Sequence, residues 1–564
     1  MVAVICGALL GVLCQSFSYL PDDGAYAYVA TRINAGDVLH RDVQDVHAGY
    51  INFANALALR WFGGDLLAMR APLVLLGALQ AALIFMLLRR RSQIAAVAAA
   101  TTFACLTFVQ FLNPTANWYA LAGVVLIITW LHNTDRATRG RYLVLGLLIG
   151  LVALIRQLSG VIAAVGAASV LICEYRGDAQ RPRQWLAPTG YGALVAVLLF
   201  YTLGRTGLAS FVLYAAWPFV VAVWLTWRTR MQNATALRIV RDVVAGGALS
   251  AVPLLAYHGA HGSLRIWFDD VVMRALSLSG ADFVDDYALA DYVSLSIEQI
   301  ATLSASGVLN GFFWLVILCA PAILGVSALR RLLRDDELPS APLVLMALWW
   351  SLVSVHYQIP LYLFYSVALT LAAVLALSDH GNRTRVYALS SGIGVLSAIG
   401  LYFHAAQPVR SIDATIAGVR VAEQVDCALP RLGVRLLAAD CARYQRRLAL
   451  IEQYSDVDDT LLAVPVNPEL YFLSGRRAAV RFFNSSLGLA TQTELDTVIQ
   501  SLAKKPPAVV FFDPADKYND ANSLALMRWV RDHFEFLTSD DGVEVFVFMS
   551  AAENRPVNTE SSTP

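Results

Sequence analysis

Apolar runs long enough to cross a bilayer recur along this sequence of 564 residues. We count about thirteen of them, because a membrane helix needs roughly 20 apolar residues and tilted or packed helices manage with somewhat fewer. Hydrophobic residues make up 57% of the chain and charged residues only 15%, which excludes an ordinary soluble domain. We therefore predict a polytopic α-helical membrane protein over residues 1–404. The runs lie at 2–20, 66–88, 93–112, 117–132, 142–156, 158–173, 189–207, 210–227, 243–260, 304–328, 341–358, 360–378 and 386–404.

Arginines cluster in the loops that follow the even-numbered runs, whereas the other loops are acidic or uncharged. Because basic loops stay on the cytoplasmic side of a membrane, we predict a cytoplasmic N-terminus. The acidic loops 21–65 and 261–303, and everything after residue 404, then face outward. The chain has 42 basic and 42 acidic side chains, so its net charge gives no indication of nucleic acid. The arginines of the basic loops are Arg89, Arg90, Arg91, Arg136, Arg139, Arg141, Arg176, Arg181, Arg183, Arg228, Arg230, Arg238, Arg241, Arg330, Arg331, Arg334, Arg383 and Arg385.

Residues 405–552 differ in kind from the rest of the chain, because charged residues become frequent and apolar runs become short. Strand-like runs alternate here with segments of helical periodicity, which predicts a small outward-facing α/β domain. Residues 553–564 are polar, and we predict that they are disordered. The strand-like runs are 461–464, 508–512 and 543–548, and the helical segments are 412–428, 440–454, 492–504 and 521–534.

The seven cysteines show no metal-ligand spacing. Five of them lie inside apolar runs, where cysteine usually acts as a small hydrophobic side chain. Cys427 and Cys441 lie in the predicted outward domain, where a disulfide can form. The sequence leaves two alternatives for this pair, a disulfide or two free thiols.

Two adjacent carboxylates, Asp22 and Asp23, stand directly after the first apolar run. A carboxylate at the edge of a bilayer is costly to desolvate and usually has a function there. Two amphipathic segments follow, over 26–33 and 51–61, and Gly36 ends the first of them. Their length and composition are typical of helices that lie in the membrane interface. We therefore predict that two interfacial helices hold both carboxylates at the membrane surface.

The residues of this loop resemble the first outward loop of GT-C glycosyltransferases. The resemblance is carried by Pro21–Ala27, Asn34–Asp37, Arg41–Tyr50 and Trp61–Gly63, and further stretches at 113–120 and 146–157 also resemble bacterial members. The closest branch contains the protein O-mannosyltransferases and the bacterial lipid A aminoarabinose transferase. The sequence departs from that branch at Val46-His47-Ala48, where bacterial relatives often have Lys-Pro or Pro-Pro.

The resemblance implies an enzyme of the bacterial inner membrane. Such enzymes move a sugar from a polyprenyl-phosphate donor to an envelope acceptor, which is a glycolipid, a polysaccharide or a protein. Asp22 matches the family position directly after Pro21, and we expect it to act as the general base, with Asp23 as the alternative. Proximity to lipid and to the second carboxylate should raise the pKa of this base. Direct attack on the donor would invert the anomeric carbon.

The leaving phosphate needs positive charge, for which arginine is well suited. Arg156 is the first candidate, Arg274 the second and His356 the third. Asp45 and His47, with Tyr50, are expected to contact substrate, by orienting the acceptor or by binding a divalent ion. Two ligands at i and i+2 do not form a metal site by themselves, so we predict no metal cofactor.

Each of these residues also has an ordinary structural explanation. The Asp22–Asp23 pair is suited to cap the following helix, and Asp45 and His47 to form a surface hydrogen bond. Arg156 is suited to anchor a helix at the membrane interface. Arg274 is suited to remain in solvent as a loop charge, and His356 is suited to a structural position at the interface.

Two other functions compete with glycosyl transfer. A lipid or sugar transporter, or a flippase, should have polar or broken helices near the bilayer midplane. The runs here are nearly free of midplane charge, which favours chemistry at the interface. A non-catalytic envelope assembly protein that kept this fold is the other alternative.

Overall fold

A computed structural model describes residues 1–176, 184–278, 288–378, 382–405 and 424–548. Every predicted apolar run falls on a helix, and nine helical stretches among these residues are long and apolar enough to cross a membrane. The chain is therefore a polytopic helical membrane protein, and the count of thirteen crossings stays a prediction. The helices are α1 (Val2–Leu13), α4 (Leu66–Leu88), α5 (Gln93–Cys105), α6 (Ala116–Asn133), α7 (Arg141–Ile155), α8 (Gln157–Glu174), α9 (Leu186–Leu203), α11 (Ala216–Arg228), α12 (Asn233–Ala260), α16 (Ala305–Leu333), α17 (Ala341–Trp350), α18 (Pro360–Leu377) and α19 (Arg383–Phe403).

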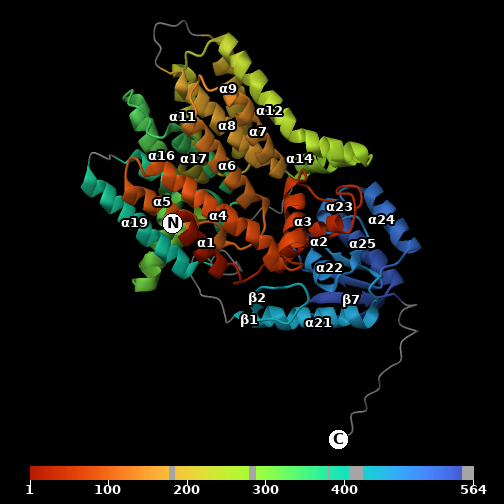
Figure 1. The fold of residues 1–564 in the computed structure, drawn as a ribbon. Helices are drawn as coiled ribbons and strands as arrows, with labels where there is room; N and C mark the ends of the chain where they lie inside the picture. The colour runs from red at the N-terminus through yellow and green to blue at the C-terminus, as the bar shows by residue number, and fades with distance from the viewer. Residues whose placement is uncertain (177–183, 279–287, 379–381, 406–423, 549–564) are drawn as a thin grey trace.

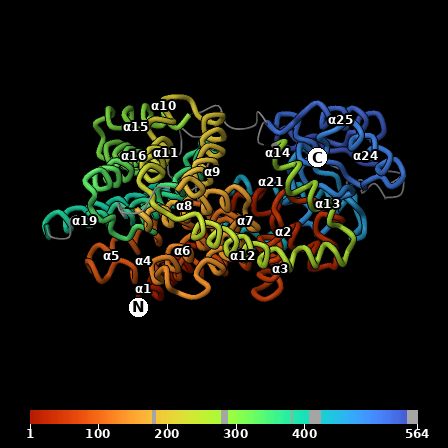
Figure 2. The backbone as a smooth tube through the Cα atoms, turned by 90° about the horizontal axis from the view of Figure 1, so that it is seen from above, coloured from red at the N-terminus to blue at the C-terminus, as the bar shows by residue number. Residues whose placement is uncertain are grey.

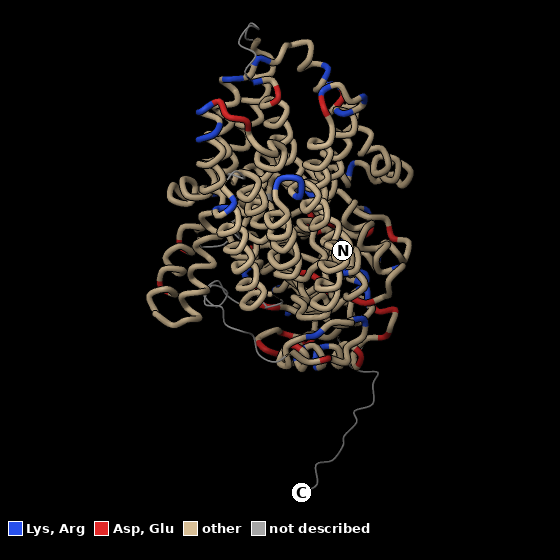
Figure 3. Tube along the Cα trace, turned by 60° about the vertical axis from the view of Figure 1, so that its left-hand side comes forward, with Lys and Arg blue, Asp and Glu red and all other residues tan. Residues whose placement is uncertain are grey.

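The helices of this module pack through one continuous apolar core. Figure 3 shows the module as largely uncharged, with charged residues gathered at its loops and in the C-terminal domain. Small residues allow the closest approach, between α7 and α12. A Cβ added to Gly146 would stand 2.0 Å from the carbonyl oxygen of Val243, so only glycine fits there.

The loop 21–65, predicted to face outward, contains two helices, as predicted, which are α2 (Leu20–Asn34) and α3 (Tyr50–Phe62). The first ends just before Gly36, whose φ of +94° stops the helix. The surroundings of α2 differ from the predicted membrane interface, because the C-terminal domain covers part of this helix. It packs against α3 on one side and against α22 (Pro468–Ser474) of the C-terminal domain on another. Helix α2 therefore lies between α3 and the C-terminal domain (Figure 1).

The second outward loop is helical over its described parts. It contains α13 (Leu264–Phe268), the π-helical η3 (Asp269–Arg274), α14 (Ala275–Leu278) and α15 (Asp291–Ala301). The remaining part of the predicted loop 261–303, residues 279–287, lies outside the described residues.

The C-terminal domain is an α/β domain built on a five-stranded sheet of order β4-β3-β5-β7-β6. Strands β4, β3 and β5 are parallel, and β7 and β6 are antiparallel to their neighbours. The predicted strand-like runs correspond to β3, β5 and β7, and three predicted helices to α21, α24 and α25. The bounds are β3 (Thr460–Val464), β4 (Arg477–Ala478), β5 (Val509–Phe512), β6 (Glu535–Asp540), β7 (Val543–Val547), α21 (Ala438–Tyr454), α23 (Ser485–Gly488), α24 (Gln492–Lys504) and α25 (Ala521–His533).

One helix predicted in this domain is wrong in its last part. Residues 424–426 of the predicted helix 412–428 form strand β1 (Gln424–Asp426), which pairs with β2 (Arg435–Leu437). Pairing with a distant partner strand outweighs the local helical periodicity here. The first part of that segment and the predicted disordered tail 553–564 lie outside the described residues.

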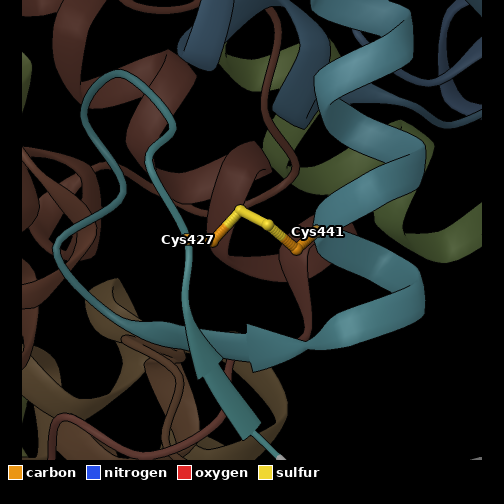
Figure 4. Close-up of a disulfide and its surroundings, with 2 residues drawn as sticks. All are labelled: Cys427 and Cys441. Atoms are coloured by element: carbon orange, nitrogen blue, oxygen red, sulfur yellow. A yellow bond between two sulfur atoms is a disulfide. The ribbon is translucent and has the colours of Figure 1, made fainter.

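A disulfide joins Cys427 and Cys441, with 5.8 Å between their Cα atoms. It connects the segment after β1 to helix α21 (Figure 4). The five other cysteines are free.

The C-terminal domain lies against the outward loops of the helical module and shares a core with them (Figure 2). The backbone N–H of Ala478 donates a hydrogen bond to the Tyr28 hydroxyl over 2.9 Å. Arg481 pairs with the buried Asp270 over 2.7 Å. The tightest contact is at Gly24, where an added Cβ would stand 2.4 Å from the Cα of Glu469. The two parts therefore fit together without space for any side chain at Gly24.

We predict that Gly24→Ala destabilises the protein by about 1–3 kcal/mol, because its methyl group overlaps the backbone of Glu469. Thermal unfolding of the purified protein in detergent would show this as a lower Tm. Gly192→Ala in α9 is the matched control, since a Cβ there meets nothing within 4 Å. Equal Tm values for the two variants would contradict the tight contact.

Candidate active site

A cavity of about 1680 Å³ lies where the helical module, α2 and the C-terminal domain meet. Segments distant in sequence form its wall. They are the first turn of α2, the loops before α3 and before α6, the junction of α7 and α8, and the loops that follow β3 and β5.

Asp22 lines this cavity from the first turn of α2. Its carboxylate is accessible from the cavity, and protein surrounds it on the other sides. This desolvation, followed by the charge of Asp23, raises the pKa of Asp22 to about 7. The amide of Asn113 donates a hydrogen bond to Asp22 over 3.4 Å and opposes part of the rise in its pKa. A carboxylate with this pKa is suited to accept a proton near neutral pH.

Asp23 has a different environment from its neighbour. It is fully buried, is not part of the cavity wall and forms an ion pair with Arg70 over 3.0 Å. The hydroxyl of Ser18 donates a further hydrogen bond to it. Burial raises the pKa of Asp23, and the guanidinium of Arg70 lowers it. Of the two carboxylates that the sequence left open as the base, only Asp22 faces the cavity.

Asp45 and His47 are joined to each other at a second position on the wall. Nδ1 of His47 and Oδ1 of Asp45 are 2.7 Å apart, and Asn52 donates to the other carboxylate oxygen over 2.7 Å. Burial raises the pKa of Asp45, but His47 and Asn52 outweigh it and lower the pKa to about 2. Asp45 is therefore an anion at any physiological pH. Tyr26 lies beside this pair, with its ring centroid 5.8 Å from that of His47.

Arg156 lines the cavity at the break between α7 and α8, where the chain is extended. Its guanidinium donates to Ser159 over 3.3 Å and lies 5.9 Å from the ring centroid of Tyr362. Among the described residues no carboxylate forms an ion pair with it. Arg156 is thus a cation on the cavity wall whose charge has no anionic partner there.

The remaining predicted residues divide between the wall and the framework. His356 lines the cavity, and its Nδ1 lies 2.6 Å from the hydroxyl of Tyr201. Tyr50 donates to the carbonyl oxygen of Ser250 over 2.6 Å, which fastens α3 to α12. Arg274 pairs with Asp270 over 3.8 Å and with Glu494, which connects η3 to the C-terminal domain. Neither Tyr50 nor Arg274 belongs to the cavity wall, and the contacts of both side chains fasten elements of the fold together.

Several wall residues were absent from the sequence prediction. Asn113 and Asn117 each have a buried side-chain oxygen without a hydrogen-bond partner. Both stand in the stretch 113–120 that carried part of the family resemblance, which was a usable signal. Glu469 comes from the C-terminal domain, is 1% exposed, and burial raises its pKa to about 7. Nothing local in the sequence connects Glu469 to Asp22.

One side of the cavity is apolar and reaches the outer surface of the helical module. Leu158 and Val161 of α8, Val197 of α9 and Leu276 of α14 line it. Val161 is 44% exposed, Val197 67% and Leu276 63%. Exposed apolar side chains of this kind favour contact with apolar chains, such as those of lipids.

Metal binding has no further support within the described part of the chain. No group of three or more His, Cys, Asp or Glu side chains there is arranged to hold a metal ion.

Comparisons with known proteins give structural likenesses at low identity. No protein-family model matches the chain, and a search of curated proteins finds no match. ArnT from Cupriavidus metallidurans, solved bound to undecaprenyl phosphate, is similar over 98% of this chain and 98% of its own, at 13% identity and a TM-score of 0.41. The oligosaccharyltransferase AglB from Archaeoglobus fulgidus was solved with an inhibitory peptide and a dolichol-phosphate. The match covers 99% of this chain and 74% of the AglB chain, at 13% identity and a TM-score of 0.44.

The Archaeoglobus fulgidus oligosaccharyltransferase in its apo form gives nearly the same result. It covers 99% of this chain and 75% of its own, with 13% identity and a TM-score of 0.43.

We predict that Arg70→Met destabilises the protein by about 3–5 kcal/mol, because it leaves Asp23 buried without its partner. The double variant Asp23→Asn/Arg70→Met should recover part of this loss, since no unpaired charge remains. Thermal unfolding in detergent measures both, with Arg265→Met as a control because that side chain is 95% exposed. A double variant that is no more stable than Arg70→Met would contradict the structural role of the pair.

Proposed function

We propose that this protein is a glycosyltransferase that moves a sugar from a polyprenyl-phosphate donor to a hydroxyl group of an envelope acceptor. The arrangement that carries the proposal is one cavity whose wall combines three chemical features. A carboxylate with a pKa near 7, Asp22, shares it with a cation that has no anionic partner among the described residues, Arg156, and with an apolar side open to lipid. The carboxylate suits the acceptor proton, the cation suits the donor phosphate, and the apolar side suits the isoprenoid chain of the donor.

The donor would bind along the apolar side of the cavity and contact Arg156. Its isoprenoid chain would lie along Val161, Val197 and Leu276, where exposed apolar side chains favour burial against lipid. Its phosphate would reach Arg156, whose planar guanidinium suits a phosphate and whose charge favours departure of the leaving group. A phosphate leaving group needs no general acid.

Asp22 would act as the general base. As the acceptor oxygen bonds to the anomeric carbon, its proton moves to the Asp22 carboxylate, and the bond to the phosphate oxygen breaks with its electron pair. A single displacement of this kind inverts the anomeric centre. Asp45 and His47 would hold the acceptor or the sugar in position.

The proposed location is the bacterial inner membrane, with the N-terminus in the cytoplasm and the C-terminal domain in the periplasm. The arginine-rich loops after the even-numbered runs support this orientation. The disulfide between Cys427 and Cys441 supports it independently, because disulfides persist in oxidising compartments.

Replacement of the base should reduce transfer without preventing folding. We expect Asp22→Asn to lower transfer from labelled undecaprenyl-phosphate hexoses or pentoses by about 10²–10⁴-fold in membranes that contain the protein. For the wild type, kcat/KM should rise with pH up to about 7 and then level off, because the base works only when deprotonated. Asp42→Asn, in the same loop but paired with Arg41, is the control.

Two results would contradict this assignment. Wild-type activity without a rise through pH 7 would remove Asp22 as the base. Movement of the labelled lipid between leaflets, without any transfer of sugar, would instead support the flippase alternative.

Loss of the cavity cation should weaken donor binding. We expect Arg156→Ala to lower the affinity for undecaprenyl phosphate by about 10–100-fold, as for loss of a hydrogen bond to a charged group. Arg156→Lys should retain part of the affinity, because it keeps the charge but not the bidentate geometry. Binding of tritiated undecaprenyl phosphate to the purified protein measures this, with Arg136→Ala as the control at a half-exposed position. Unchanged affinity in Arg156→Ala would mean that the phosphate binds elsewhere.

A further inference from the structure

The C-terminal domain presents the carboxyl ends of two neighbouring parallel strands to the cavity. Val466, Asn467 and Glu469 follow β3 on the wall, and Asp513 and Asp516 follow β5. In open sheets of this kind, ligands bind in the crevice beyond the carboxyl ends of the strands. The domain therefore turns its usual ligand-binding edge toward Asp22.

Two buried side chains on this edge have polar atoms without partners. Asn467 is 7% exposed, and its Nδ2 has no hydrogen-bond acceptor. Glu469 is 1% exposed, and Tyr444 donates to its Oε1 over 3.1 Å while Oε2 has no partner. Buried polar groups are nearly always hydrogen-bonded, so unpartnered groups on a cavity wall indicate a ligand.

The edge lies next to the proposed base. Gly24 stands two residues after Asp22 in the same helix, and its backbone contacts that of Glu469 so closely that an added Cβ would be 2.4 Å from the Glu469 Cα. Asp513, the first residue after β5, has its Oδ1 fixed by a hydrogen bond from the backbone N–H of Ala515 over 3.0 Å. An acceptor held at this edge would have its hydroxyl group near Asp22.

We propose that Asn467, Glu469 and Asp513 form the acceptor subsite and that the acceptor hydroxyl belongs to a sugar. The proposal rests on the glycosyltransferase function above and names the class of its second substrate. The Asn467 amide N–H donates hydrogen bonds and the carboxylate oxygens accept them, so the subsite offers both, as neighbouring sugar hydroxyls require. An extended peptide would instead pair with a strand edge. The edge strands are β4 and β6, and within the described chain neither contributes a residue to the cavity wall.

The test uses the full-length protein, labelled undecaprenyl-phosphate sugar and the envelope fraction of the host as acceptor. Portions of that fraction are treated beforehand with periodate, which cleaves vicinal diols of sugars, or with a protease. Periodate should abolish incorporation of label, and protease should leave it unchanged. Asn467→Ala should raise the amount of acceptor at half-saturation about tenfold, as for loss of one hydrogen bond.

Asp513→Asn is a second variant of nearly identical shape, and it should shift half-saturation in the same direction. Gln492→Ala removes an exposed amide of the same domain and is the matched control. Loss of incorporation after protease treatment would overturn the sugar acceptor, and half-saturation equal to that of Gln492→Ala in both variants would overturn the subsite. If the wild type consumed no donor, the proposed function itself would fail and this inference with it.

Discussion

The guanidinium of Arg70 holds together the part of the chain on which the cavity depends. It donates to the carbonyl oxygens of Cys14, Ser16 and Phe17 and to the carboxylate of Asp23, over 2.7–3.0 Å. These bonds join the end of α1 to the first turn of α2 inside the protein. Because successive helical residues point about 100° apart, fixing Asp23 inward directs its neighbour toward the cavity. One buried ion pair thus gives two adjacent carboxylates different environments.

The C-terminal domain also shapes the surroundings of Asp22. It shares an apolar core with α2 and α3, and it contacts Gly24 at the turn that carries Asp22. Asp22 lies on the cavity between the two parts of the chain, and desolvation by the surrounding protein is the main reason that its pKa is raised. The carboxylate of raised pKa, the cation and the apolar side of the cavity therefore come from different segments, and no single segment contains all of them.

Most of the candidate site residues that the sequence suggested lie on one cavity, and two of them do not. Asp22, Asp45, His47, Arg156 and His356 all line the cavity, and the roles that the loop pattern and the family resemblance suggested for them stay predictions. Arg274 and Tyr50 fasten elements together instead, because arginine and tyrosine serve packing and binding equally well. Arg70 was overlooked, although one charge inside an apolar run is itself a signal of a buried partner. The distant residues Asn467 and Glu469 gave no signal at all.

The sequence by itself determined the helical membrane module, the two helices of the first outward loop and the α/β character of the C-terminal domain. These depend on hydropathy and periodicity, which are local properties of the chain. Tertiary structure alone decided which of Asp22 and Asp23 faces the cavity. It also decided that Arg274 pairs with carboxylates, whereas no carboxylate among the described residues pairs with Arg156. It also decided that the edge of the C-terminal sheet meets the proposed base. Desolvation and ion pairing depend on neighbours in space, and those neighbours come from segments far apart in the sequence.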